Sequence, residues 1–189
     1  MEQYIGSFPY EEISDDEKTS LLHMREEEKL ARDVYNYLYE RWGMRIFDNI
    51  SLAEQMHMDA IATILQKYDI PDPVLSDDDR GTFSDEGLKE LYTTLITKGN
   101  NSITDALLVG ATIEDLDIFD LQNALLKVDN MDILFVFGNL KKGSENHIRA
   151  FSSQLMGFNI IYTAQYISQD ELDIILSSST NGRGRGRNN

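Results

Sequence analysis

The chain of 189 residues contains no cysteine. This absence excludes disulfide bonds, thiolate catalysis, iron–sulfur clusters and zinc sites built on cysteine. Proline is nearly as scarce, with three in the whole chain, which favours helices over many short strands. Because the sequence also lacks any run of about 18 apolar residues, we expect no segment to span a membrane.

Positive charge is in short supply as well. The chain has 17 Lys and Arg residues against 33 Asp and Glu, which gives a formal net charge of -16. Such a surface repels phosphate groups, so we expect neither nucleic acid nor an anionic membrane as a partner. Residues 178–189, rich in glycine and arginine, are the exception, because a tail of this composition allows a weak contact with RNA.

The N-terminus carries no visible targeting signal. It lacks the basic start and the apolar stretch of a signal peptide. We therefore expect a cytoplasmic protein, or an exported one from which the signal peptide is already absent.

Length and composition predict one globular domain with an all-α fold. Hydrophobic residues make up 41% of the chain, enough for a core without disulfide bonds. We predict an N-terminal arm at 1–13, a helical bundle at 14–177 and a disordered tail at 178–189. Turn and capping signals predict helices at 14–42, 50–68, 85–98, 102–127 and 129–156, with a bend at Gly143, and a short helix after Ser168. The four long helices form the bundle, the helix at 85–98 lies in the long connection between the second and third of them, and the short C-terminal helix packs outside.

The predicted helix at 102–127 carries acids on its apolar face. At about 100° per residue, Glu114 and Asp117 share a stripe with leucine and isoleucine residues, whereas Asp115 and Asp120 fall off the stripe and are expected to face solvent. Burying an ionised, unpaired carboxylate costs several kcal/mol. We therefore expect something cationic beside this face.

The other three long helices repeat the pattern. Glu54 and His57 lie three residues apart on the apolar face of the second helix, so a carboxylate and an imidazole can reach one metal ion. His147 lies on the apolar face of the fourth, and Glu28 on that of the first. Each long helix thus turns at least one oxygen or nitrogen ligand inward.

Each of these residues also has a purely structural interpretation. Ser51 and Glu54 fit a capping box, which would make Glu54 a helix cap. His147 alone fits a hydrogen-bonded core histidine. Glu28 belongs to a run of three acids, in which Glu27 is nearly as inward. The coincidence on four separate core stripes favours a metal site.

Charge counting supports two metal ions. Four inward carboxylates carry four negative charges, which two divalent ions cancel while the histidines stay neutral. Mixed carboxylate and imidazole ligation suits iron or manganese, and zinc less well.

The motifs resemble those of rubrerythrin-type ferritin-like proteins. The run 28–35 resembles their first metal helix, which reads ExxAR followed by Tyr seven residues after the Glu. Glu54 and His57 match the ExxH of their second helix, and Glu114 and Asp117 resemble the two acids of the third. The wider motifs EEEKLARDVY, SLAEQMHMDA, GATIEDLDI and NHIRAF together are similar to an uncharacterised family of prokaryotic ferritin-like domains, over roughly residues 21–176.

The resemblance implies a dinuclear iron centre, with manganese or zinc as alternatives. In such a centre Glu54 bridges the ions and His57 and His147 bind one each. Glu28, Glu114 and Asp117 complete the ligand set, and Tyr35 lies close enough to hydrogen-bond a ligand or serve as a redox side chain. Expected reactions are with dioxygen or peroxide, as an oxidase, a peroxidase or a ferroxidase. Without cysteine-bound iron, electrons come from a separate donor or from the substrate, and a homodimer remains open.

One departure from the resemblance keeps two other functions open. The fourth helix of such proteins has an acid three residues before its histidine, but Ser144 stands there before His147. Glu145 cannot replace the acid because it points roughly 160° away on the helical wheel, so Asp117 would have to compensate. The alternatives are a non-catalytic domain with one zinc or manganese ion, and an interaction domain whose inward acids pair with Arg25, Arg32 or Arg149. Arg149 is a poor candidate, because it lies opposite His147 on the wheel.

Overall fold

The computed structural model describes residues 2–76 and 79–178, and this part of the chain contains helices but no strand. The helices are α1 Glu2–Ile5, α2 Asp15–Trp42, α3 Arg45–Lys67, α4 Glu86–Gly99, α5 Ile103–Leu125, α6 Met131–Met156 and α7 Gln169–Ser177. The all-α prediction is confirmed. Almost all of the predicted tail lies outside the described residues. No described helix is both long and apolar enough to cross a membrane.

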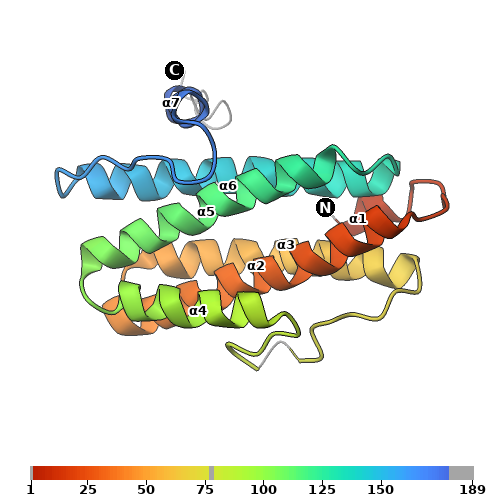
Figure 1. Ribbon diagram of the computed structural model, residues 1–189, viewed down its shortest axis with the longest axis horizontal. Helices are drawn as coiled ribbons and strands as arrows, with labels where there is room; N and C mark the ends of the chain where they lie inside the picture. The colour runs from red at the N-terminus through yellow and green to blue at the C-terminus, as the bar shows by residue number, and fades with distance from the viewer. Residues whose placement is uncertain (1, 77–78, 179–189) are drawn as a thin grey trace, which may run out of the picture.

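The four long helices pack as two pairs. Helix α2 lies along α3, and α5 lies along α6, and the pairs contact each other through α2 with α5 and α3 with α6 (Figure 1). The shorter α4 belongs to the connection between α3 and α5 and packs on α2 and α5, as the sequence predicts. Helix α7 packs on the outside of the bundle against α6, and its Glu171 accepts a hydrogen bond from Gln122 of α5 (Figure 1).

Several helix ends follow capping chemistry. Ser14 and Glu17 form a capping box that starts α2, and Gly43 ends it in the left-handed conformation at φ 65°. Helix α3 begins at Arg45, five residues earlier than predicted, because its N-cap Met44 makes no side-chain hydrogen bond and gives no signal in the sequence.

The early start of α3 decides between two interpretations of Glu54. Glu54 lies in the third turn of the helix, so it cannot cap the first turn. The Ser51 hydroxyl donates to the Asp48 carbonyl oxygen at 2.9 Å. The capping-box interpretation is therefore wrong.

Two further local features bear on the predictions. The N-terminal arm contains the short helix α1, whose Ile5 is buried in the core beside α3. Gly143 does not interrupt α6, which is helical from Met131 to Met156.

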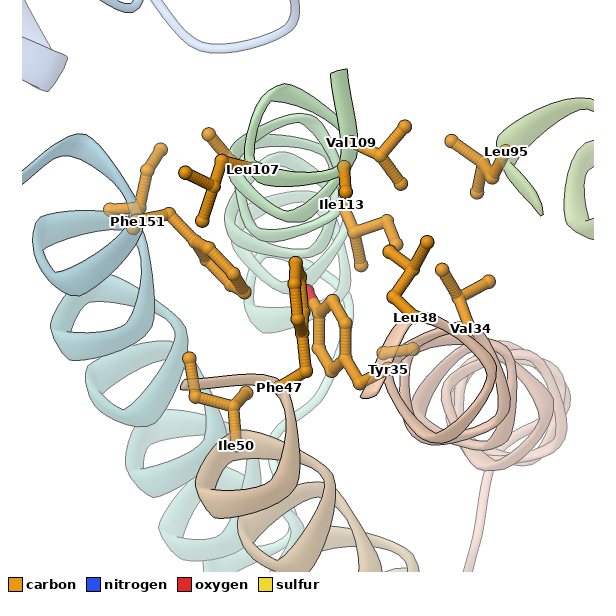
Figure 2. Close-up of a cluster of buried hydrophobic side chains, with 14 of the residues drawn as sticks. Val34, Tyr35, Leu38, Phe47, Ile50, Leu95, Leu107, Val109, Ile113 and Phe151 are labelled. Atoms are coloured by element: carbon orange, nitrogen blue, oxygen red, sulfur yellow. The ribbon is translucent and has the colours of Figure 1, made fainter. Parts of the chain in front are cut away.

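A layer of polar side chains divides the hydrophobic core into two clusters. Along each long helix, residues of one cluster precede the layer and residues of the other follow it. One cluster includes Leu30, Val34, Phe47, Ile50, Leu107, Ile113, Ile148 and Phe151, and is drawn in part in Figure 2. The other includes Leu21, Met24, Ile61, Leu65, Leu121, Val136, Phe137 and Leu140. All six predicted metal-ligand residues lie in the layer between them.

Asp115 does not face solvent as predicted, because it is fully buried. Its carboxylate accepts hydrogen bonds from the Tyr162 hydroxyl at 2.8 Å and from the backbone N–H groups of Gln165 at 2.6 Å and Ile167 at 2.9 Å. The segment after α6 thus folds back over the outer face of α5. A helical wheel of one helix cannot show this return, since it depends on a segment about fifty residues away.

We expect Asp115→Ala to destabilise the protein by about 3 kcal/mol, because it leaves several buried donors without an acceptor. The exposed Asp173, which accepts only from the Gln169 side chain, provides a matched control. Asp173→Ala should change the free energy of unfolding by no more than about 0.5 kcal/mol. Urea unfolding of both variants measures the difference, and equal effects would show that Asp115 is not the anchor of the C-terminal segment.

Candidate metal centre

Two groups of acids and histidines meet in the polar layer. In the first, His57 Nδ1 lies 3.1 Å from Glu28 Oε2 and 2.8 Å from Glu54 Oε2. In the second, His147 Nδ1 lies 2.9 Å from Glu54 Oε1 and 3.3 Å from Glu114 Oε2. Glu54 thus belongs to both groups, with one oxygen toward each histidine.

The two imidazole rings face each other across this carboxylate. Their centroids are 5.9 Å apart and their planes are inclined by 27°. The separation is less than the spacing between two packed helices. The His57 and His147 rings therefore lie side by side, although they come from α3 and α6.

Asp117 completes the cluster from α5. The Ser144 hydroxyl on α6 donates to its Oδ2, while its Oδ1 is buried without a hydrogen-bond partner among the described residues. Ser144 occupies the place where the resemblance leads one to expect an acid. The serine does not replace that acid but instead holds an acid of the neighbouring helix.

Several of the converging atoms lack partners although they are close to one another. Glu28 Oε1, Glu54 Oε1, Asp117 Oδ1 and His147 Nδ1 are buried and make no hydrogen bond in the described part of the chain. For His147 and Glu54 the distance is short at 2.9 Å, but the alignment is not that of a hydrogen bond. Buried polar atoms are nearly always satisfied, so a set of four in one place indicates a missing common partner.

The pKa values of the histidines and of Glu54 reflect their mutual attraction. Burial alone lowers the pKa of both imidazoles, but the adjacent carboxylates outweigh it and raise both values well above the usual range. Burial alone raises the pKa of Glu54, yet His147 and His57 outweigh it and hold the value well below its usual range. Without metal, protons on the histidines neutralise part of the site.

The remaining acids have too little positive charge beside them. Burial raises the pKa of Glu28 well above its usual range, and raises that of Glu114 as well. Burial and the charge of Glu114 raise the pKa of Asp117 to about 7. The metal-free site therefore tends to hold protons where a metal ion would otherwise supply the positive charge.

Tyr35 connects the cluster to the aromatic part of the core. Its hydroxyl donates to Glu114 Oε1, and its ring packs against Phe151 at 5.4 Å and Phe47 at 6.3 Å between centroids (Figure 2). Burial and the charge of Glu114 raise the pKa of Tyr35 well above its usual range, so the hydroxyl stays protonated and keeps donating. The rings close one end of the site to water.

Gly143 makes room for the His57 ring. A Cβ atom at this position of α6 would lie 2.6 Å from His57 Cε1 and 2.7 Å from Nε2. The glycine lies one residue before Ser144. Two adjacent residues of α6 therefore shape the site: Gly143 leaves room for the His57 ring, and Ser144 donates a hydrogen bond to Asp117.

Glu27 lies in a different place from its neighbour Glu28. It is buried, with Oε2 3.6 Å from Nε2 of the exposed His23, and His23 Nε2 lies 3.9 Å from Asp120 Oδ2. His23 is not among the residues predicted from the sequence, although its spacing of four residues from Glu27 is a usable signal. Asp120 is half-buried rather than fully solvent-facing.

The arginines considered as partners for the inward acids make contacts elsewhere. Arg25 pairs with Asp72 at 3.0 Å and Arg32 with Asp33 at 2.8 Å. Arg149 donates to the Ile175 carbonyl oxygen at 3.0 Å. Among the central acids, Glu28 and Glu54 contact His57, and Glu54 and Glu114 contact His147.

These features define an all-α bundle protein with a buried cluster of carboxylates and imidazoles. Residues 17–179 match the family described as an uncharacterized protein domain, DUF2202, and the chain belongs to this family. It is 54% identical over 187 residues to the uncharacterized protein MJ0754 of Methanocaldococcus jannaschii, covering 99% of this chain and 100% of that one. The crystal structure of that hypothetical protein has a similar fold, with a TM-score of 0.89 and 55% identity, covering 92% of this chain and 98% of the other.

We expect Gly143→Ala to displace the His57 ring and to lower the free energy of unfolding by about 1–3 kcal/mol. Gly138 of the same helix provides the control, because a Cβ atom there meets no atom within 4 Å. Gly138→Ala should instead stabilise the protein by about 0.5–1 kcal/mol through helix propensity. Chemical denaturation measures both effects, and a stabilising Gly143→Ala would show that the imidazole has room to move.

We expect the metal-free protein to lose stability between pH 5.5 and pH 8. Asp117, with a pKa of about 7 against an ordinary 3.8, holds a proton in the folded state that the unfolded state has already released. The raised histidine pKa values act in the same direction, because their contribution is complete below about 6.5 and is lost as the pH rises through the folded values. Asp117 alone accounts for a loss on the order of 2 kcal/mol.

Thermal or chemical unfolding at both pH values, in the presence of chelator, measures this loss. Asp117→Asn should reduce the difference between the two pH values, since the amide does not titrate. A stability that is constant or rises from pH 5.5 to pH 8 would contradict the assigned protonation.

Proposed function

We propose that this chain is a ferritin-like dinuclear carboxylate protein that binds two iron ions and reacts with dioxygen or peroxide. The observation that supports it best is the meeting of four carboxylates and two imidazoles from four helices, where several buried ligand atoms have no hydrogen-bond partner in the described part of the chain. The arrangement, with an ExxH pair on one helix, matches the ligand pattern of ferritin-like bundles.

The donor set fits the proposed metal. Oxygen and imidazole nitrogen ligands suit iron and manganese, whereas thiolate-loving metals find no ligand in a chain without cysteine. Two divalent ions would offset the four carboxylate charges and release the protons that the metal-free site holds. Glu54 would lie between the ions, with Glu28 and His57 on one side and Glu114 and His147 on the other.

Asp117 takes the place of the acid that α6 lacks. Its position one turn from Glu114 on α5 puts it in the same layer, and the hydrogen bond from Ser144 fixes one oxygen while the other remains free. Asp117 on α5, held by Ser144 on α6, thus provides the carboxylate that a glutamate on α6 would provide. This arrangement favours two metal positions over one.

The surrounding residues suit oxidative chemistry. When bound, a pair of iron ions supplies electrons to dioxygen or peroxide. The Tyr35 hydroxyl donates a hydrogen bond to Glu114 and so keeps this carboxylate oriented. The packed rings of Phe47 and Phe151 exclude water on that side. Because the chain contains no cysteine-bound iron, ferrous iron itself or a separate electron donor must restore the reduced state.

Protein purified without chelator should contain about two iron ions per chain after gel filtration, and Mössbauer spectroscopy should show two high-spin ferric ions after exposure to air. Glu54→Ala should remove both ions, because each group loses a ligand. Glu145→Gln, an acid of α6 that pairs with Lys141, is the control and should leave the metal content unchanged.

The other outcomes separate the alternatives. One zinc or manganese ion per chain, with no consumption of dioxygen or peroxide, would support a non-catalytic metal-binding domain. A protein that binds no metal even when reconstituted anaerobically with ferrous iron would support an interaction domain.

A further inference from the structure

A second, smaller cluster of potential ligands lies one helical turn from the central site. It consists of His23 and Glu27 on α2 and Asp120 on α5, whose ligand atoms all lie within 4.8 Å of one another. Glu27 is the residue before Glu28, and Asp120 lies three residues after Asp117. Each of these two acids is thus the neighbour, along its own helix, of an acid in the central cluster.

Glu27 distinguishes this cluster from an ordinary group of solvated surface charges. Its side chain is 4% exposed, and its Oε2 is buried without a hydrogen-bond partner in the described part of the chain. The same oxygen is directed toward His23 Nε2 at 3.6 Å, too far for a hydrogen bond but suitable for two ligands of one ion. A buried carboxylate oxygen with no donor is costly unless a cation completes it.

The cluster is also open to solvent on one side. The side chain of His23 is 42% exposed and that of Asp120 is 26% exposed. Both residues line a surface hollow of about 160 Å³, which Lys127 also lines. An ion arriving from solvent therefore meets His23 and Asp120 first and the buried Glu27 behind them.

We propose that His23, Glu27 and Asp120 form a third divalent-cation site, at which ions bind before they pass to the central cluster. One imidazole and two carboxylates are a ligand set for ferrous, manganous, cobaltous or zinc ions. From Glu27 the next acids inward are Glu28 on the same helix and Asp117 on α5. The transfer step rests on the proposed function, whereas binding at the third site does not.

The partial exposure of the cluster implies weak and reversible binding. Water competes for the ion at the exposed histidine, and Glu27 is the one buried residue of the three. We therefore expect the third ion to be lost on gel filtration, while the ions in the closed central cluster remain. This difference in retention separates the two kinds of site experimentally.

Anaerobic titration with cobalt(II), followed by its visible absorption and by equilibrium dialysis, tests the site. The native protein should bind three ions per chain, and His23→Ala and Asp120→Asn should each bind two. Both variants should fill the central cluster at least about fivefold more slowly in stopped-flow mixing. Glu90→Gln, an exposed acid of α4 that changes the net charge as Asp120→Asn does, should bind three ions at the native rate.

Two results would overturn the proposal. Three ions bound by His23→Ala and Asp120→Asn would exclude the site, and a native loading rate in both would exclude its role in transfer. Glu54→Ala separates this proposal from the proposed function, because it disables the central cluster only. It should still bind one cobalt ion, and the double variant with His23→Ala should bind none.

Discussion

The burial of like charges is the constraint on which the structure depends. Glu28, Glu54, Glu114 and Asp117 are buried together in the low-dielectric core, where each carboxylate loses its hydration and repels the others. Two histidines reduce this repulsion, and the raised pKa values of three of the acids show that they do not remove it. A fold that keeps such a layer needs apolar packing on both sides of it, and the core is accordingly divided into two clusters. The same repulsion makes the cavity receptive to divalent cations.

The side chains around the layer hold it in a fixed arrangement. Tyr35 orients Glu114, Ser144 orients Asp117, and Gly143 leaves the space that the His57 ring occupies. Each contact joins two different long helices, so the positions of the ligands and the packing of the bundle are determined together. Side chains held in this way are preorganised, so the proposed metal ions would bind without a rearrangement of the helices.

The ends of the layer differ in their access to solvent. Toward Tyr35, packed aromatic rings close the cavity. In the other direction, the acids continue through Glu27 and Asp120 to a hollow in the surface. A chain with a formal net charge of -16 attracts cations in general, but this run of acids gives the attraction a direction.

Periodicity along the chain was enough to predict the all-α class, the four long helices and the inward direction of six polar side chains, because helical geometry sets which residues share a face. It also identified Ser144 as the departure on the fourth helix. What each acid faces depends instead on how the helices pack. Asp115 is off the apolar stripe yet buried, because the segment after α6 returns over it, and Glu27 and Glu28 are adjacent yet belong to different clusters. The start of α3 was not predictable either, since Met44 offers no cap. A wheel describes one helix in isolation, whereas partners, exposure and pKa values are set by residues distant in the chain.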